Sequence, residues 1–279
     1  MASLKDELNI KKMSYLLRIS RSGYYRFLKQ KFYISTDEKF IRERIKRIWI
    51  KSKKTYGMRR ILQELRKSSI EIGKKKCRKY MEAEKIHIKY RKKHKVQTTN
   101  SKHKENIAPN LLNQNFKVES KDRIWVSDVT FLKCSTSWVY LCVILDLYSR
   151  KVVNYRISSN NDSELTCNTL SDAISSRNPE KGLIFHSDRG SNYCSKDMQN
   201  LISNNMFLRS NSRVGNCYDN AVAESFFSSL KREMDVNVFY SMEDCKNILF
   251  EHIEIFYNRQ RSHSYLDYMS PEQFEKVLQ

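Results

Sequence analysis

The chain has 279 residues and a formal net charge of +21, and no apolar stretch in it approaches the length of a membrane-spanning helix. The charge is unevenly distributed: residues 1–120 contain 34 Lys and Arg against 11 Asp and Glu, and residues 121–279 contain 18 against 20. Solubility does not require an excess of one sign confined to one segment. The distribution therefore favours nucleic acid as a partner over a membrane surface.

The first 90 residues are expected to form short helices. Residues 11–28 (KKMSYLLRISRSGYYRFL) have helical periodicity that is interrupted near residues 19–23, where Ser20 or Ser22 fits the N-cap of a second helix. This pattern predicts a small helix-turn-helix-like module over residues 1–34. Further helices over residues 37–50 and 56–86 predict a helical DNA-binding module over residues 35–90. The basic side chains that we expect to contact DNA there are Arg59, Arg60, Lys74, Lys75 and Lys76.

Residues 91–120 lose periodicity and are polar and basic, with RKKHK at 91–95. They predict a linker that lies along nucleic acid. A solvated tether without DNA contact fits the same composition nearly as well.

The pattern changes at residue 121 to that of an α/β domain that continues to residue 279. Segments rich in Val, Ile, Tyr and Trp predict three consecutive antiparallel strands over 123–134, 138–147 and 151–157. Alternating helices and strands follow: a helix over 163–176, a strand over 182–185, a further helix, a strand near 207–208, and helices over 220–234 and 242–258. The expected fold is a mixed sheet with helices on both faces, joined to a basic all-α N-terminal region.

Seven cysteines are scattered along the chain without a Cys-x-x-Cys pair. This spacing favours neither a zinc module nor a disulfide framework. It indicates free thiols in a reducing compartment, which predicts a cytoplasmic protein.

Three carboxylates stand out by their positions. Asp128 lies inside an apolar strand, where a carboxylate needs a cation or hydrogen-bond partners. Asp188 follows the GLIF strand, and Glu224 lies on an apolar helix. Mg²⁺ prefers oxygen ligands of this kind. Each residue alone also fits an ordinary surface or turn position, and Asp146 and Asp219 are further candidates, so these patterns leave the choice open.

The catalytic region resembles the polynucleotidyl-transferase superfamily, which includes retroviral integrases, and more closely the OrfB-type transposases of the third insertion-sequence family. The matching segments are WVSDVTF (125–131), HSDRGSNY (186–193), GNCYDNAVAESFFSSLKRE (215–233), YNRQRSHS (257–264) and SPEQF (270–274). The resemblance implies a ribonuclease H-like fold for residues 121–279. It also implies that Asp128, Asp188 and Glu224 are the catalytic, metal-holding acids.

The same resemblance implies two Mg²⁺ ions, replaceable by Mn²⁺, that serve both DNA cleavage and strand transfer by a 3′-hydroxyl. Lys231, seven residues after Glu224, and Asn192 are expected to contact DNA. His186 is expected to orient Asp188, although a structural histidine is about as good an interpretation. Asp146 and Asp219 are expected to have structural roles.

The implied partners are the terminal inverted repeats of the element, target DNA and further copies of the chain. The product of an upstream reading frame, or a frameshift fusion with it, is also an implied partner, and the expected place of action is the bacterial nucleoid. Two alternatives stay open: a ribonuclease H-like nuclease that stops at hydrolysis, and a catalytically inactive DNA-binding regulator. A retroviral integrase is disfavoured because the sequence offers no His/Cys zinc module.

Overall fold

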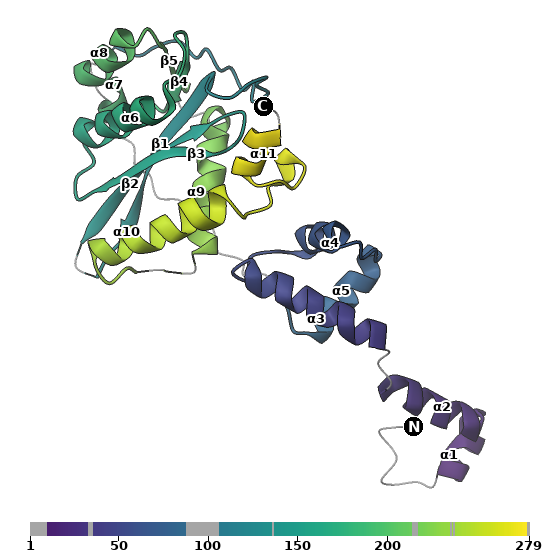
Figure 1. Cartoon of the computed structure of the whole chain (residues 1–279). Helices are drawn as coiled ribbons and strands as arrows, with labels where there is room; N and C mark the ends of the chain where they lie inside the picture. Colours follow the sequence, from purple (N-terminus) through teal and green to yellow (C-terminus); the bar gives the residue numbers. More distant parts are fainter. Residues whose placement is uncertain are drawn as a thin grey trace. The chain divides into compact units, whose positions relative to one another are not determined.

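The computed structural model describes residues 10–32, 36–87, 106–135, 137–213, 217–234, 236 and 238–277, and the chain divides into two units at residue 88 (Figure 1). In the described part, no helix is long and apolar enough to cross a membrane. The cysteines that it describes are free thiols, as the sequence predicts.

The first unit is entirely helical in its described part. Its helices are α1 (Ile10–Leu16), α2 (Arg21–Phe32), α3 (Thr36–Lys51), α4 (Met58–Lys67) and α5 (Lys74–Ala83). The backbone N–H of Gly23 donates to Ser20 Oγ at 2.9 Å, so Ser20 rather than Ser22 caps α2. Helices α3, α4 and α5 pack together around fully buried apolar side chains, which include Ile45, Ile61, Leu65 and Cys77.

The second unit is built on a five-stranded mixed sheet in the order β3-β2-β1-β4-β5. Its strands are β1 (Ile124–Lys133), β2 (Trp138–Asp146), β3 (Val152–Ser158), β4 (Ile184–Ser187) and β5 (Leu208–Asn211). The first three strands are antiparallel neighbours, and β4 and β5 continue the sheet in parallel from the other edge of β1. This topology confirms the predicted ribonuclease H-like sheet.

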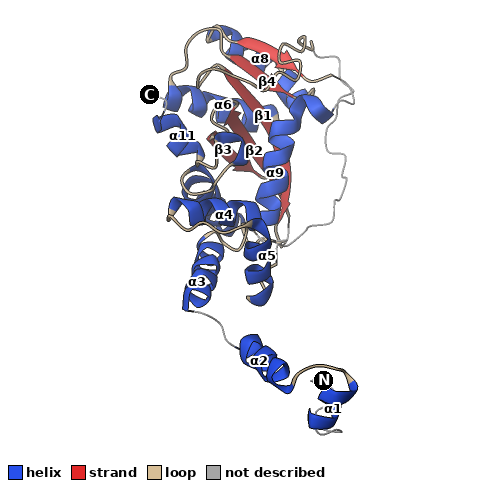
Figure 2. Cartoon of the chain, turned by 90° about the vertical axis from the view of Figure 1, so that its right-hand side faces the viewer, coloured by secondary structure: helices blue, strands red, loops and turns tan. Residues whose placement is uncertain are grey.

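Helices cover both faces of the sheet, as predicted (Figure 2). One face packs against α9 (Ala221–Glu233) and α10 (Met242–Phe250), and the other packs against α6 (Ser163–Arg177) and α8 (Lys196–Asn204). Helix α9 is preceded by the 3₁₀ turn η2 (Cys217–Asn220) and lies next to β1. Each core therefore rests on one set of alternating strand side chains.

The C-terminal part of the predicted linker differs from the expectation. The backbone N–H groups of Ala108 and Leu111 donate to Asn211 Oδ1 and Ser210 Oγ, both at 2.9 Å, and Leu112 is buried in the core of the second unit. These contacts fix this segment beside β5, so the segment around 108–112 is part of the second unit and not of a tether. Residues 88–105, which include RKKHK, lie outside the described residues.

The predicted helix over 242–258 is present, but its second half, η3 (Glu251–Asn258), is π-helical. The wider turn brings Tyr257 and Asn258 against the β2–β3 connection. The Tyr257 hydroxyl donates to Arg150 O at 3.0 Å, and Asn258 both donates to and accepts from the backbone of Val152. The short helices α7 (Ser191–Cys194), η4 (Ser264–Leu266) and α11 (Pro271–Val277) complete the unit. The sequence did not predict α11.

Candidate active site

Asp128 and Asp188 are brought together by the pairing of β1 with β4. The two strands run parallel, and Val126 pairs with His186. Each carboxylate lies two residues beyond that pair on its own chain segment, and paired strands are about 4.8 Å apart. Both acids therefore line one cavity of about 150 Å³.

The backbone turn after β4 holds Asp188 at this place. The N–H of Gly190 donates to Asp188 Oδ1 at 2.9 Å. A Cβ at residue 190 would lie 3.1 Å from the same oxygen and still closer to Asn192 Oδ1. A side chain at this position would push the amide of Asn192 or the carboxylate away, so glycine leaves room for both groups to stay in place.

The electrostatic surroundings of Asp128 favour a cation. Burial raises its pKa, and the nearby carboxylates of Asp188 and Glu224 raise it further. The Val129 N–H, 2.8 Å from Asp128 Oδ1, and the Lys231 ammonium partly offset this rise. Neighbouring negative charges with few compensating donors are the setting in which a divalent ion binds.

Glu224 and Lys231 lie on α9, and the charges of both side chains affect the pKa of Asp128. Ala223, Phe226, Phe227 and Leu230 bury the other side of this helix against the sheet. Lys231 Nζ donates to Thr130 Oγ1 at 2.6 Å, two residues along β1 from Asp128. Glu224 is exposed and does not line the cavity, although partial burial raises its pKa.

The donor set fits a hard divalent ion. In the described part of the chain, no three acidic, His or Cys side chains are close enough to form a preassembled metal site. Asp128 and Asp188 share the cavity, however, and Mg²⁺ is commonly held by one or two carboxylates while it retains several waters. Two carboxylates in the cavity and a third on α9 are compatible with that preference.

Asn192 lines the same cavity, whereas His186 does not. His186 is fully buried, with Nδ1 2.8 Å from Ser210 Oγ and Nε2 3.2 Å from Ser212 Oγ. Burial lowers its pKa to about 4, so the ring is neutral at pH 7. These contacts favour the structural interpretation of His186 over a direct orienting role.

Asp146 and Asp219 are fully buried acceptors, in keeping with structural roles. Asp146 accepts from Asp122 N, Ser149 N and Ser149 Oγ at 2.7–2.9 Å. Asp219 accepts from Arg213, Asn110 and Gln114, and the Arg213 guanidinium holds its pKa well below the usual range. Both carboxylates hold loops of the second unit in place.

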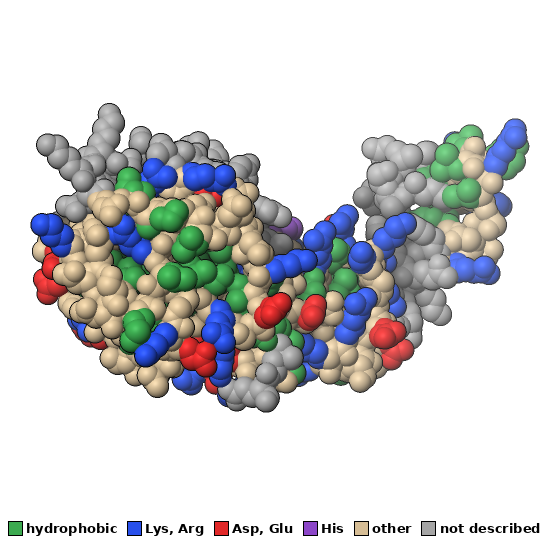
Figure 3. All heavy atoms as spheres, turned by 90° about the horizontal axis from the view of Figure 1, so that it is seen from above, with side chains coloured by type: hydrophobic (Ala, Val, Ile, Leu, Met, Phe, Trp, Pro, Cys, Tyr) green, Lys and Arg blue, Asp and Glu red, His purple; other side chains and the backbone are tan. Residues whose placement is uncertain are grey.

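The predicted DNA contacts of the first unit lie on α4 and α5. Arg59 and Lys74, Lys75 and Lys76 are exposed, whereas Arg60 is half-buried with its guanidinium 5.5 Å from the centre of the Tyr56 ring. Lys74 and Lys75 line a cleft of about 270 Å³ together with Met58, Arg78, Lys79 and Glu82. On the face shown in Figure 3, Lys and Arg side chains gather on the helical part in the middle of the picture and are more scattered over the second unit.

Three family models match the chain. An HTH-like domain matches residues 35–94, and two models of the integrase core domain match residues 119–217 and 224–277. The integrase core matches thus span Asp128, Asp188 and Glu224.

Curated relatives match over almost the whole chain. A 31 kDa protein of the insertion element IS600 from Shigella sonnei is 38% identical and covers 95% of this chain and 97% of its own length. The transposase InsF of the insertion sequence IS3A from Escherichia coli is 35% identical and covers 96% of this chain and 94% of its own length. The chain belongs to the IS3 family of transposases. Its function is DNA transposition, and its enzyme class is that of the polynucleotidyl transferases.

Solved structures similar to this transposase include the catalytic core domain of HTLV-2 integrase in complex with magnesium. It is 18% identical, with a TM-score of 0.44, and covers 55% of this chain and 96% of its own. A Mos1 transposase catalytic domain has a TM-score of 0.42 at 17% identity and covers 48% of this chain and 70% of its own.

The cavity also contains side chains that the sequence did not single out. Phe131, Tyr140, Asn161 and Tyr193 line it beside the two acids. From the sequence, Phe131 and Tyr140 are only residues of predicted strands, because aromatic side chains favour strands in general. Tyr193 is only the last residue of the matched segment HSDRGSNY. That Phe131 and Tyr140 lie side by side on one face of the sheet depends on the register of β1 with β2.

Proposed function

We propose that this transposase cleaves the ends of its element and joins them to DNA at a site formed by Asp128, Asp188 and Glu224. The proposal is supported above all by the cavity that Asp128 and Asp188 share, each two residues beyond the paired residues Val126 and His186 of the parallel strands β1 and β4. Glu224 contributes through its electrostatic effect on Asp128.

The three acids divide the binding of divalent ions between them. Asp128 would be the common ligand, and Asp188 and Glu224 would each complete one of two sites for Mg²⁺, or for Mn²⁺ in its place. When bound, two such ions activate the attacking oxygen and stabilise the leaving oxygen of an in-line displacement. The Gly190 N–H keeps the Asp188 carboxylate oriented by its bond to Oδ1.

Lys231 positions the DNA strand. In the free protein its ammonium donates to Thr130 Oγ1, next to the acids along β1. When DNA binds, the same ammonium exchanges this bond for a phosphate oxygen. Asn192, which lines the cavity, contacts the same strand.

The attacking group is first water, which leaves a free 3′-hydroxyl, and then that hydroxyl itself. Attack on the same strand beyond the other end releases the element as a circle. We propose that several copies of the chain assemble on the DNA, alone or with the upstream-frame product, in the bacterial cytoplasm at the nucleoid.

Joining of pre-cleaved ends tests this function. The substrate is a duplex with the end of the DNA element that carries this reading frame, cut to expose its 3′-hydroxyl, together with plasmid DNA and Mg²⁺. We expect covalent joining. An uncut duplex of the same end is assayed beside it. Hydrolysis of the uncut duplex without joining of the pre-cut one would identify a nuclease, and the absence of both reactions would identify an inactive regulator.

The first unit supplies most of the DNA affinity in this proposal. Replacing Lys74, Lys75 and Lys76 by Ala should weaken binding to any duplex and make the log–log salt dependence shallower by up to about 0.9 per lost phosphate contact. Affinity measured over a range of salt concentrations gives this slope. The control replaces the exposed Lys181, Lys196 and Lys246 of the second unit, and an equally large change there would contradict the assignment.

A further inference from the structure

Three aromatic side chains lie together on one face of the sheet, next to the proposed active site. Phe131 of β1 pairs with Tyr140 of β2, and Trp138 lies two residues from Tyr140 on the same face. The rings of Phe131 and Trp138 meet edge to face, with centroids 5.1 Å apart and an interplanar angle of 74°. We name Phe131, Trp138 and Tyr140 the aromatic ledge.

On this face of the sheet, the exposure of the side chains increases toward the C-terminal end of β1 and the N-terminal end of β2. Ser127 and Cys142 are fully buried beside Tyr193, whose hydroxyl lies 2.8 Å from Ser127 Oγ and 3.6 Å from Cys142 Sγ. Phe131 and Tyr140 are half-buried, and Trp138 is 49% exposed. The ledge thus extends from the closed core to solvent, so its outer ring is accessible to a ligand.

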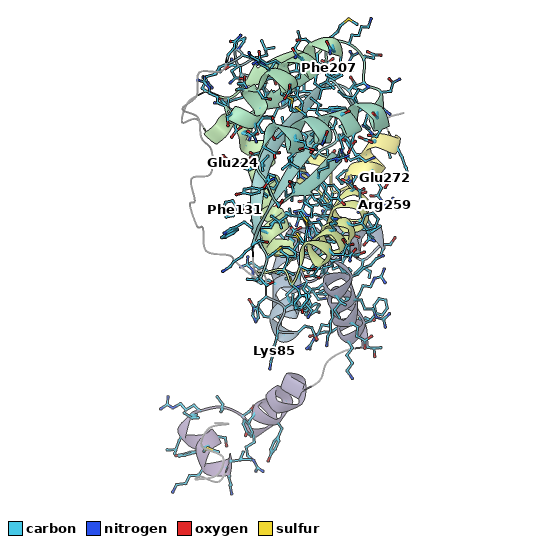
Figure 4. All side chains as sticks on the ribbon, turned by 90° about the vertical axis from the view of Figure 1, so that its left-hand side faces the viewer. Lys85, Phe131, Phe207, Glu224, Arg259 and Glu272 are labelled. Atoms are coloured by element: carbon cyan, nitrogen blue, oxygen red, sulfur yellow. The ribbon has the colours of Figure 1, made fainter. Side chains whose placement is uncertain are left out.

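The ledge is continuous with the proposed active site. Phe131 and Tyr140 line the cavity that Asp128 and Asp188 share. Lys231 Nζ lies 4.8 Å from the centre of the Phe131 ring, and Phe131 and Glu224 lie along the same edge of the second unit (Figure 4). A nucleotide whose phosphate is held at the acids therefore has its adjoining group beside Phe131 and Tyr140. Trp138 extends this surface away from the cavity through its contact with the Phe131 ring.

The remaining cavity wall carries amides. Asn192 Nδ2 donates to Asn161 Oδ1 at 3.1 Å, and both residues line the cavity. Amide side chains present donors and acceptors that match the edges of nucleobases. The cavity and its rim thus combine aromatic rings and amides, which can bind a base, with an ammonium group, which can bind a phosphate. This combination matches a nucleotide better than it matches the apolar surface of a protein.

We propose that the aromatic ledge binds an unpaired nucleobase next to the phosphodiester that is cut. A base inside a duplex has both of its faces covered by neighbouring bases, so only an unstacked base can lie on Phe131 or Trp138. The inference rests on the proposed function, because that function places the phosphodiester at Asp128 and Asp188. Stacking of a base on an aromatic side chain tolerates any sequence.

The test compares two short fluorescent duplexes that differ only in whether the nucleotides at one end are paired or mismatched. Their affinities for the full chain are measured by anisotropy without divalent ions. Wild type should bind the mismatched end more tightly. Trp138→Ala should lose about 5- to 100-fold of affinity for the mismatched duplex and keep its affinity for the paired one, and Trp138→Phe should retain most of the preference.

Phe250→Ala is the matched control, because Phe250 is 54% exposed in the same unit but lies outside the ledge. It should bind both duplexes as wild type does. Equal affinity of wild type for the two duplexes, or equal losses on both in Trp138→Ala, would overturn the proposal. Asp128→Asn separates the two claims: it should keep the preference for the mismatched end and lose cleavage. Cleavage by that variant would refute the proposed function, whereas its preference for the mismatched end reports separately on binding of an unpaired base by the ledge.

Discussion

Replacing Asp128 by Asn is expected to abolish DNA cleavage and joining while leaving the metal-free protein at least as stable as wild type. Burial and the carboxylates of Asp188 and Glu224 raise the pKa of Asp128, so its charge is held there at a cost in stability. Asn removes the charge and keeps the shape. Loss of the shared metal ligand should lower both reactions by at least about a thousandfold, or ~4 kcal/mol of transition-state stabilisation.

Thermal unfolding with and without Mg²⁺ or Mn²⁺ measures the other half of this prediction. The ions bind the folded site but not the dispersed carboxylates of the unfolded chain, so they should raise the Tm of wild type. Asp128→Asn should lose most of that rise. Asp197→Asn, at an exposed position in the first turn of α8, is the control that should keep it. An equal rise in wild type and Asp128→Asn would place the ions elsewhere.

Arg261→Ala is expected to cost about 3–5 kcal/mol of unfolding free energy, because it removes the buried partner that donates to both oxygens of Glu233. Only the more exposed Arg232, 3.6 Å from this carboxylate, then remains as a cation beside it. The Arg261 guanidinium donates to both oxygens of Glu233 at 2.7 and 2.8 Å, and both side chains are almost fully buried. His252 Nε2 lies 4.0 Å from the same carboxylate. The pair joins the last turn of α9 to the segment after η3. Its loss should therefore also disturb Glu224 and Lys231 and lower activity.

Denaturant unfolding measures the change. Arg259→Ala is the control, because Arg259 is exposed and only meets Glu272 at 3.5 Å, near the surface of the unit (Figure 4). An exposed pair of this kind contributes less than about 1 kcal/mol. Replacing Glu233 by Met and Arg261 by Leu together should restore much of the stability, because no charge is then left unpaired. A loss below about 1 kcal/mol in Arg261→Ala would contradict the role of this pair.

Local pattern was sufficient for most of the elements. The strands over 124–133 and 138–146 follow from dense β-branched and aromatic residues, and Ser20 caps a helix because its hydroxyl reaches the Gly23 N–H. The predicted strand over 182–185 is displaced by about two residues, to Ile184–Ser187. Its exact place depends on pairing with β1 and β5, which lie far away in the sequence.

Long-range contacts account for what the sequence left open. The segment around Leu112 is polar and irregular, and two of its backbone N–H groups donate to Asn211 and Ser210 on β5, which lie far away in the sequence. From the sequence, Asp219 is a residue near the start of a helix. In the structure its buried carboxylate accepts hydrogen bonds from Arg213 and from the amide side chains of Asn110 and Gln114. The choice of Asp128, Asp188 and Glu224 came from resemblance, because their proximity depends on the order of the sheet.

The most direct test of the central claim is the joining of pre-cleaved element ends by Glu224→Gln, measured beside wild type and the exposed control Glu243→Gln. Gln removes one negative metal ligand but has nearly the helix propensity of Glu, so α9 and DNA binding should be preserved. The account predicts that Glu224→Gln binds the ends and fails both to cleave and to join them, while Glu243→Gln does all three. Substantial joining by Glu224→Gln would show that the third carboxylate of the site is a different residue.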